Sequence, residues 1–299
     1  MPRRTIGLDI GGTKIQVGII TDAHQVIASD QLPNDIRDTA RTLKSITQAI
    51  DRFFSTQTIG GIGVGITGTV DTATGIVAES PNLPHNWHRV PLQKILEKKY
   101  RVPVRIDNDA NCIALAEATV GLGKKYNTVL SITIGTGIGA GLVINKRIYH
   151  GGFNAVEFGH TIIESPSLAR CSCGRYGHFE ALVSGRALQS IYRQKTGAKL
   201  SSYDIVAAAR AGKRVAKQVM ARASTSLAIG LANAIHAYSP EIIVLGGGLA
   251  HLPMLIKPAL KHMRPLIAPA ILKKTKIVVS KLHYDAGVIG ATLIVPRHR

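Results

Sequence analysis

The sequence has few cysteines, few aromatic residues and no long uninterrupted apolar run, and each shortage excludes a class of protein. Three cysteines in 299 residues form no disulfide framework, so a reducing cytoplasm is the expected location. Aromatic residues make up 5% of the chain, which leaves few side chains on which nucleic-acid bases can stack. The longest apolar stretch, from Ile242 to Ile256, contains three glycines, a histidine and a proline, so no membrane-spanning helix is predicted.

Acidic residues are also scarce: 37 Lys and Arg face 18 Asp and Glu, for a formal net charge of +19. This charge predicts attraction to polyanions and phosphorylated ligands, but it says nothing about the fold. Basic residues are dense between Arg193 and Arg222 and between Lys257 and Lys281. Neither segment carries a nucleic-acid-binding motif. Solvated helix faces are therefore the favoured interpretation, and a nucleic-acid partner is disfavoured, although the charge alone leaves it open.

The order of apolar segments predicts an α/β protein. A length of 299 residues with 45% apolar composition is sufficient for two lobes. Ile6–Ile10 and Ile15–Ile20 are strand-like runs on either side of Gly11 and Gly12, which predicts a β-hairpin. Residues 39–54 carry apolar residues at helical spacing. Strands that alternate with helices in this way are typical of the α/β class.

The opening pattern partly recurs later in the chain. Apolar residues 129–134 precede a glycine-rich segment, 135–141, and a second apolar run, 142–144. This short repeat suggests two related lobes. A helix over 219–238 and a buried strand over 242–245 are also predicted.

Three glycine-rich turns follow predicted strands and favour phosphate or nucleotide binding. Adjacent glycines let backbone N–H groups approach phosphate oxygens, and a carboxylate at a strand end can hold the hydration shell of Mg²⁺. Ordinary structural turns are the alternative. A dinucleotide fingerprint at the second turn is rejected, because a strand rather than a helix is predicted after it. The candidate residues are Asp9, Gly11, Gly12, Thr13 and Lys14 in the first turn, Gly135, Thr136 and Gly137 in the second, and Gly246, Gly247 and Gly248 in the third.

Four residues have the composition of a structural zinc site. His160, Cys171, Cys173 and His178 offer two imidazoles and two thiolates, a complete tetrahedral set with no open position. Such a site would fix the loop between residues 160 and 180. The alternative is two buried thiols and two unrelated histidines.

Carboxylates suited to chemistry occur in two places. Asp107, Asn108 and Asp109 follow a predicted strand at 102–106 and begin a predicted helix. A helix N-cap explains one of these residues but not the whole cluster. Asp109 at the strand end is placed to accept a proton from a substrate hydroxyl, and Glu157 and Glu180 flank the predicted zinc loop, where they can grip neighbouring sugar hydroxyls.

Together these segments resemble the ROK family (repressor, open reading frame, kinase) of bacterial sugar kinases. The resemblance covers Asp9 to about Gly290, with the motifs in the expected order: DIGGTK, GITGTVD, SPNLP, DNDANC, IGTGIGAG, EFGH, CSCGRYGHFE and IIVLGGG. Three positions depart from the usual family pattern. His178 stands at the place of a third zinc-loop cysteine, Thr67 replaces a proline, and Val156 replaces the glycine before Glu157.

The resemblance implies a two-lobed actin-like ATPase (ribonuclease H-like) fold, with residues 1–109 and 286–299 in one lobe and 110–285 in the other. It implies a kinase that uses ATP, Mg²⁺ and structural Zn²⁺, forms a homodimer and closes over a hexose. Asp109 would be the catalytic base, and His160 would reach the sugar with its second ring nitrogen. The implied sugar-contacting residues are Asn82, Asn108, Asp109, Glu157, His160 and Glu180.

Several functions remain open at this point. Glucokinase is favoured, and kinases of N-acetylglucosamine, N-acetylmannosamine or fructose are alternatives. A sugar-responsive repressor of the same family would carry an N-terminal helix-turn-helix domain, for which the early position of Asp9 leaves no room in this sequence. A nucleic-acid-associated binding protein is suggested by the charge alone.

Overall fold

The computed structural model describes residues 4–54, 58–80, 82–152 and 156–296, which divide into two compact units. Unit 1 comprises Met1–Asn127, Gly141–Val156 and Lys281–Arg299, and unit 2 comprises Thr128–Ala140 and Glu157–Ser280. Residues 110–127 and 141–156 thus belong to unit 1, whereas the predicted division placed them in the second lobe. The physical reason is that helix α3 (Asp109–Thr119) packs against helix α10 (Asp285–Leu293) of unit 1.

Unit 1 is built on a five-stranded sheet of order β3-β2-β1-β4-β7. Its strands are β1 (Arg4–Ile10), β2 (Lys14–Thr21), β3 (Val26–Pro33), β4 (Ile59–Ile66) and β7 (Val104–Asn108). The first three strands are antiparallel neighbours, and β1, β4 and β7 run parallel. The predicted hairpin is confirmed, with Ile10 paired to Ile15 across the glycine turn.

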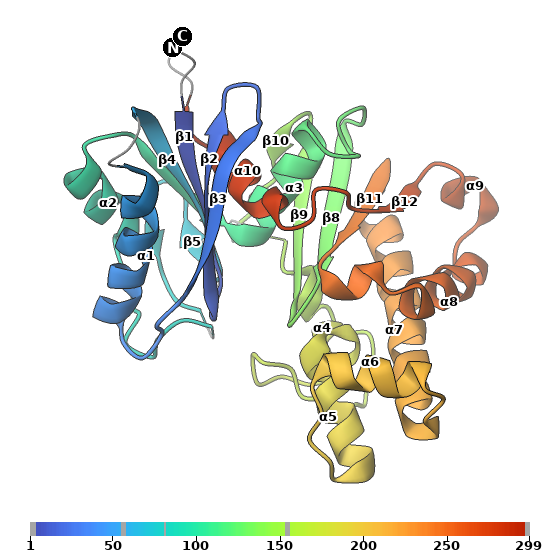
Figure 1. Ribbon diagram of the computed structural model, residues 1–299. Helices are drawn as coiled ribbons and strands as arrows, with labels where there is room; N and C mark the ends of the chain where they lie inside the picture. Colours follow the sequence, from blue (N-terminus) through green and yellow to red (C-terminus); the bar gives the residue numbers. More distant parts are fainter. Residues whose placement is uncertain (1–3, 55–57, 81, 153–155, 297–299) are drawn as a thin grey trace. The chain divides into compact units, whose positions relative to one another are not determined.

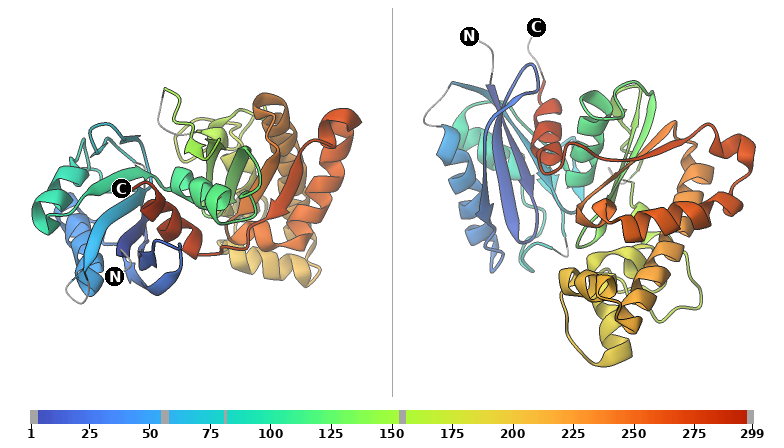
Figure 2. Two further views of the ribbon diagram at one scale, coloured as in Figure 1. Left: turned by 90° about the horizontal axis from the view of Figure 1, so that it is seen from above. Right: turned by 45° about the vertical axis from the view of Figure 1, so that its right-hand side comes forward.

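Helices cover both faces of this sheet (Figure 1). Helix α1 (Thr39–Phe54), predicted with the same bounds, and helix α2 (Leu92–Tyr100) lie on one face. Helices α3 and α10 lie on the other, as Figure 2 also shows. The short ribbon of β5 (Val70–Asp71) and β6 (Ile76–Val77) follows β4. Glycine permits the close approach of α10, because a β-carbon at Gly63 would stand 1.7 Å from the Ala291 carbonyl oxygen.

A second five-stranded sheet has the order β10-β9-β8-β11-β12. Its strands are β8 (Thr128–Ile134), β9 (Ile138–Ile144), β10 (Arg147–Ile148), β11 (Ile242–Gly246) and β12 (Lys276–Val279). In unit 2, β8, β11 and β12 are parallel. A strand, β9, follows the second glycine turn, so the rejection of a dinucleotide fingerprint is confirmed.

The remaining helices of unit 2 pack around α7 and beside the sheet. They are α4 (Glu180–Val183), α5 (Gly185–Thr196), α6 (Ser202–Arg210), α7 (Arg214–Tyr238), α8 (Pro253–Met263) and α9 (Pro269–Leu272), with 3-10 turns η1 (Phe158–His160), η2 (Gly248–His251) and η3 (Arg264–Leu266). Helix α7 begins five residues before the predicted start at 219. Among the residues that the structure describes, no helix combines the length and apolar character needed to cross a membrane.

Candidate functional site

The first set of predicted residues gathers where β1, β4 and β7 end, at one edge of the unit 1 sheet. Parallel strands place their carboxyl ends together, and this edge is where ligands bind in open α/β sheets. The backbone N–H of Thr67, just after β4, donates to the carbonyl of Ile10 at 3.1 Å. The side-chain amide of Asn108, at the end of β7, donates to the carbonyl of Gly68 at 3.1 Å. The three strand ends are therefore linked by direct hydrogen bonds.

The first glycine turn packs against Asn82. Gly11 N–H donates to the Lys14 carbonyl at 3.0 Å, which closes the hairpin. A β-carbon at Gly12 would stand 2.7 Å from the Asn82 carbonyl oxygen, so only glycine allows this approach. The Asn82 amide in turn lies 3.3 Å from the hydroxyl of Thr67. A residue predicted to contact sugar thus lies beside a turn predicted to hold phosphate.

Helix α3 starts at Asp109 because Asn108 caps it. The Asn108 side-chain oxygen accepts hydrogen bonds from the backbone of Ala110 at 2.9 Å and of Asn111 at 3.4 Å. The backbone of Asn108 is extended, as an N-cap requires. The N-cap interpretation therefore holds for Asn108, while Asp109 becomes the first helical residue at the strand end.

The carboxyl group of Asp9 has a raised pKa. Its burial, and secondarily the negative charge of Asp109, raise the pKa of Asp9 from 3.8 to about 7, while Lys14 acts in the opposite direction. Gly287 of α10 makes room for this carboxylate, because a β-carbon there would stand 2.3 Å from Asp9 Oδ2. Two carboxylates that repel each other form a local negative potential, which a divalent cation relieves.

The second and third glycine turns lie side by side at the carboxyl ends of β8 and β11 in unit 2. These strands are parallel neighbours, with Gly246 paired to Thr133. Gly247 adopts φ +81°, and a β-carbon there would stand 2.5 Å from the Ile134 carbonyl oxygen. The carbonyl of Gly135 accepts from the N–H of Gly185, the first residue of α5, at 2.8 Å. The second turn is thereby fixed to the start of α5.

Glu180 lies directly against the second glycine turn. Its Oε2 accepts from the backbone N–H of Ile138 at 2.9 Å, and its Oε1 accepts from the Ser172 hydroxyl at 2.6 Å. A β-carbon at Gly137 would stand 2.5 Å from Glu180 Oε2. The carboxylate is therefore buried and held in one orientation by the turn and by the cysteine loop.

The four predicted metal ligands come together in unit 2. One ligand atom from each of His160, Cys171, Cys173 and His178 lies within 4.8 Å of the others. Cys171 Sγ is 3.5 Å from His160 Nδ1, and Cys173 Sγ is 3.3 Å from His178 Nδ1. Burial, with a smaller contribution from His160, lowers the pKa of His178, which favours the neutral imidazole that binds metal. The structure thus brings the four predicted ligands close enough together for one metal ion.

The second ring nitrogen of His160 points to a carboxylate. His160 Nε2 lies 3.7 Å from Glu157 Oε2, on the opposite side of the ring from the cluster.

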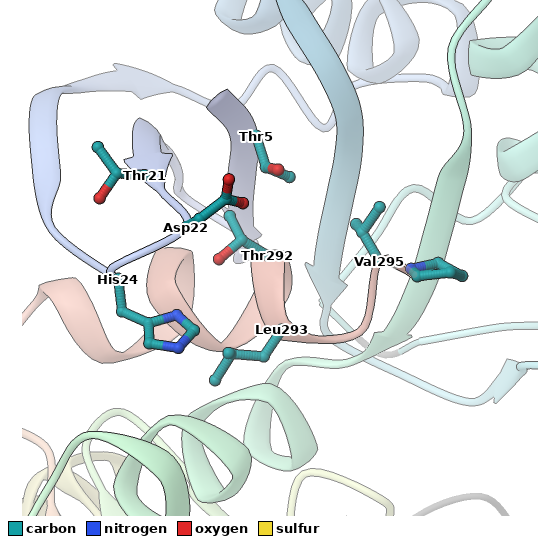
Figure 3. Close-up of a pocket in the computed structure, with 8 residues that line it drawn as sticks. Thr5, Thr21, Asp22, His24, Thr292, Leu293 and Val295 are labelled. Carbon is teal, nitrogen blue, oxygen red and sulfur yellow. The ribbon is translucent and has the colours of Figure 1, made fainter. Parts of the chain in front are cut away.

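A cavity of about 380 Å³ in unit 2 is lined by ten residues that include Ser172, Glu180 and Arg186. A second, much smaller cavity of about 20 Å³ lies in unit 1 (Figure 3), where His24 and Asp22 approach Thr292. None of the predicted site residues lines that smaller cavity.

The predicted residues therefore fall into two groups, one in each unit. The unit 1 group is Asp9, Gly11, Gly12, Thr13, Lys14, Asn82, Asn108 and Asp109. The unit 2 group is Gly135, Thr136, Gly137, Glu157, His160, Cys171, Cys173, His178, Glu180, Gly246, Gly247 and Gly248. Sequence reasoning missed two polar residues that hold these groups in place, His150 and Ser172. Ser172, between the two cysteines, had a positional signal, whereas His150 had none.

Comparison with known proteins identifies relatives along the whole chain. The family described as ROK family matches residues 5–298. A glucokinase from Thermotoga maritima is 31% identical, with 99% of this chain and 98% of the relative covered. An N-acetyl-D-glucosamine kinase from Aliivibrio salmonicida is also 31% identical, with 96% and 98% covered.

A solved structure agrees with the fold. The ROK family glucokinase from Streptomyces griseus, determined with glucose and AMPPNP, matches with a TM-score of 0.85 at 28% identity. The match covers 98% of this chain and 99% of that one. The predicted class, an α/β fold of the actin-like ATPase type, is thereby confirmed.

Proposed function

This chain belongs to the ROK family, and from that premise we propose that it is an ATP-dependent hexose kinase with glucose as its preferred substrate. Glucokinases are among its relatives in both sequence and structure. The observation that carries the proposal is the common sheet edge in unit 1. There, Asp109 begins α3 at the end of β7. The Gly11-Gly12 turn follows the end of β1, and β4 lies between β1 and β7 in the sheet.

Asp109 is proposed as the general base. In phosphoryl transfer most catalysis comes from positioning and charge neutralisation, and the proton of the attacking hydroxyl leaves late. An ordinary carboxylate at the correct place is therefore sufficient. The Asn108 cap and the start of α3 fix the backbone on which this carboxylate is carried.

Asp9 and Lys14 are proposed to serve the phosphate end of ATP. Mg²⁺, when bound, would neutralise phosphate charge there. Burial is the main cause of the raised pKa of Asp9 and the negative charge of Asp109 is the second, and a nearby cation would offset that second cause. Thr13 and the backbone of Gly11 and Gly12 would donate hydrogen bonds to phosphate oxygens.

Roles are also proposed for the unit 2 residues. The turn at 135–137 would hold phosphate, and the turn at 246–248 would accommodate the adenine. Glu157 and Glu180 would accept hydrogen bonds from sugar hydroxyls, and His160, with Nδ1 toward the cluster, would donate one through Nε2–H. The support for Glu180 is its fixed carboxylate beside Gly137, and the support for His160 is that Nε2 faces away from the cysteines.

Structural zinc is proposed for the cluster of two cysteines and two histidines. Tetrahedral zinc with normal bond lengths sets its ligand atoms about 3.3–3.8 Å apart. The two sulfur–nitrogen distances of 3.5 and 3.3 Å fit this requirement, whereas the four ligand atoms as a set span up to 4.8 Å and would draw together around a bound ion. Bound zinc would fix the orientation of His160 and hence of the ring nitrogen offered to the sugar.

The family resemblance further suggests a homodimer, which analytical ultracentrifugation tests.

N-acetylglucosamine is the second candidate substrate, because a kinase of that sugar is as similar in sequence as the glucokinase is. A coupled ADP-release assay over glucose, N-acetylglucosamine, N-acetylmannosamine, mannose and fructose decides between them. The highest kcat/KM is expected for glucose. Asp109→Asn should lower kcat by about 10²–10⁴, the usual scale for loss of a general base. Absence of sugar-dependent ADP release, or full activity of Asp109→Asn, would refute the proposal.

A further inference from the structure

The unit 1 site contains a hydrogen-bonded pair, Asp107 and His150, that the proposed mechanism does not use. Asp107, the last but one residue of β7, is 3% exposed. Its Oδ1 accepts hydrogen bonds from the Asn108 backbone at 2.7 Å and from the Asn111 side-chain amide at 2.9 Å. Its Oδ2 lies 2.8 Å from Nε2 of His150. The same carboxylate thus holds β7, the first turn of α3 and the segment that follows β10.

The bond to His150 gives this buried carboxylate a hydrogen-bond donor for Oδ2. A buried carboxylate without a partner is strongly unfavourable, and removing one member of a buried pair destabilises what remains. The Asp107 hydrogen bond is the main cause that raises the pKa of His150, with burial acting against it. The imidazole therefore gains proton affinity from this contact and serves as the donor.

The position of Asp107 gives the pair a consequence for Asp109. Asp107 and Asp109 flank Asn108, the residue that caps α3, and Asp107 also holds Asn111 in the first turn of that helix. If Asp107 loses the His150 contact, its carboxylate keeps only the two bonds to Oδ1, and Oδ2 is free to turn toward solvent or another donor. Either movement disturbs the turn from which Asp109 projects.

We propose that His150 is a positioning residue for Asp109, which it holds in place through its hydrogen bond to Asp107. The proposal rests on the proposed kinase function, in which Asp109 is the base.

The test compares three variants of the full-length protein with wild type. His150→Ala removes the donor, and kcat should fall about 10–100-fold, because displacement of a catalytic group by about 1 Å can cost on the order of 10²-fold. KM for glucose and for ATP should change less than about threefold, because ground-state contacts are retained. His150→Gln keeps an N–H at a similar reach and should restore most of kcat. His262→Ala, an exposed histidine of α8, is the control and should behave as wild type.

A double-mutant cycle separates positioning from a general loss of stability. If His150 acts through Asp107, then His150→Ala should have little further effect on kcat in an Asp107→Asn background. Thermal melts identify the folded fraction, so that rates refer to folded protein. Additive effects in the cycle, an unchanged kcat of folded His150→Ala, or failure of Gln to restore activity would each overturn the proposal.

Asp109→Asn in the same assay keeps this inference distinguishable from the proposed function. Wild-type activity that is lost in Asp109→Asn but kept in His150→Ala refutes only the role of His150. Full activity of Asp109→Asn refutes the role of Asp109 as base and the positioning role together.

Discussion

Gly287 of α10 lies against the carboxylate of Asp9, so that a β-carbon at position 287 would stand 2.3 Å from Asp9 Oδ2. Gly287→Ala should therefore push this carboxylate away from its place beside the first glycine turn. The gain in helix propensity, about 0.8–1.0 kcal/mol, offsets part of the cost, because the end of a side chain can move. We expect stability within about 1 kcal/mol of wild type, together with a higher Mg²⁺ requirement and a kcat lowered about tenfold. Steady-state kinetics over a magnesium titration measure both.

Gly290→Ala provides the contrast on the same helix. Its β-carbon would stand 1.8 Å from the carbonyl oxygen of Cys112, and backbone cannot yield as a side chain can. This variant should lose about 1–3 kcal/mol of unfolding free energy, the usual cost of overpacking.

For Gly287→Ala, an unchanged magnesium requirement in folded protein would contradict the role proposed for Asp9 at the magnesium site.

The raised pKa of Asp9 predicts that removal of its charge stabilises the protein more at high pH than at low pH. Between its ordinary pKa of 3.8 and its folded value of about 7, the folded state keeps a proton that the unfolded state releases. Stability contributed by this group therefore falls as pH rises through that window. The difference in Tm between Asp9→Asn and wild type, without nucleotide, should grow from pH 5 to pH 8. Glu79→Gln, which removes a carboxylate charge at an exposed position, is the matched control.

The elements that carry the site were predictable because their signals are local. Residues 39–54 form a helix as predicted, because the apolar residues of α1 repeat at helical spacing along it. The first hairpin followed from two apolar runs around a glycine pair. The cysteines and histidines were recognised as a set because their chemistry is rare and their spacing short.

Other features depend on contacts between distant segments, which local patterns do not report. Residues 110–127 join unit 1 because α3 packs on α10, more than 160 positions later in the chain. The role of His150 depends on a contact to Asp107, 43 residues away. The early part of α7 was missed because Arg214, Lys217 and Gln218 are polar and exposed, although Ala216 in the same turn is buried.

Loss of a single ligand should remove the metal from the cluster. His178→Ala leaves three ligands, and zinc content should fall from about one per chain to well below one. His178→Cys supplies a thiolate at the same place and should retain zinc, because cysteine and histidine both complete tetrahedral sites. Elemental analysis after gel filtration measures the content. Cys112→Ala, a buried cysteine outside the cluster, should keep the metal.

Chelation of wild type tests whether the metal stabilises the fold. A ligand bound only by the folded state adds about 4 kcal/mol when its free concentration is 1,000 times Kd, so a strong chelator should lower Tm by several degrees. His178→Ala should show no such shift. A wild-type Tm that is insensitive to chelation, in protein proven to contain zinc, would contradict a structural role.

Glu180 should decide sugar affinity rather than the rate of phosphoryl transfer. Its carboxylate is fixed by Ile138 and Ser172, and either oxygen has further lone pairs with which to accept a sugar hydroxyl. Glu180→Gln removes the charge but keeps the shape. A hydrogen bond to a charged group contributes about 1.5–3 kcal/mol, so KM for the sugar should rise about 10–100-fold with a smaller change in kcat.

Ser172→Ala separates the orientation of Glu180 from its charge. This variant keeps the carboxylate and the Ile138 bond but removes the 2.6 Å contact to Oε1. Oε1 then keeps only the longer contact from Cys171 Sγ at 3.6 Å, so the sugar KM should rise less than in Glu180→Gln, by about threefold to tenfold, which corresponds to one ordinary hydrogen bond. KM for ATP should stay constant in both variants, because the second glycine turn keeps its bond from Gly185 to Gly135. If Glu180→Gln instead lowered kcat and left the sugar KM unchanged, the carboxylate would act in the transition state and not in sugar binding.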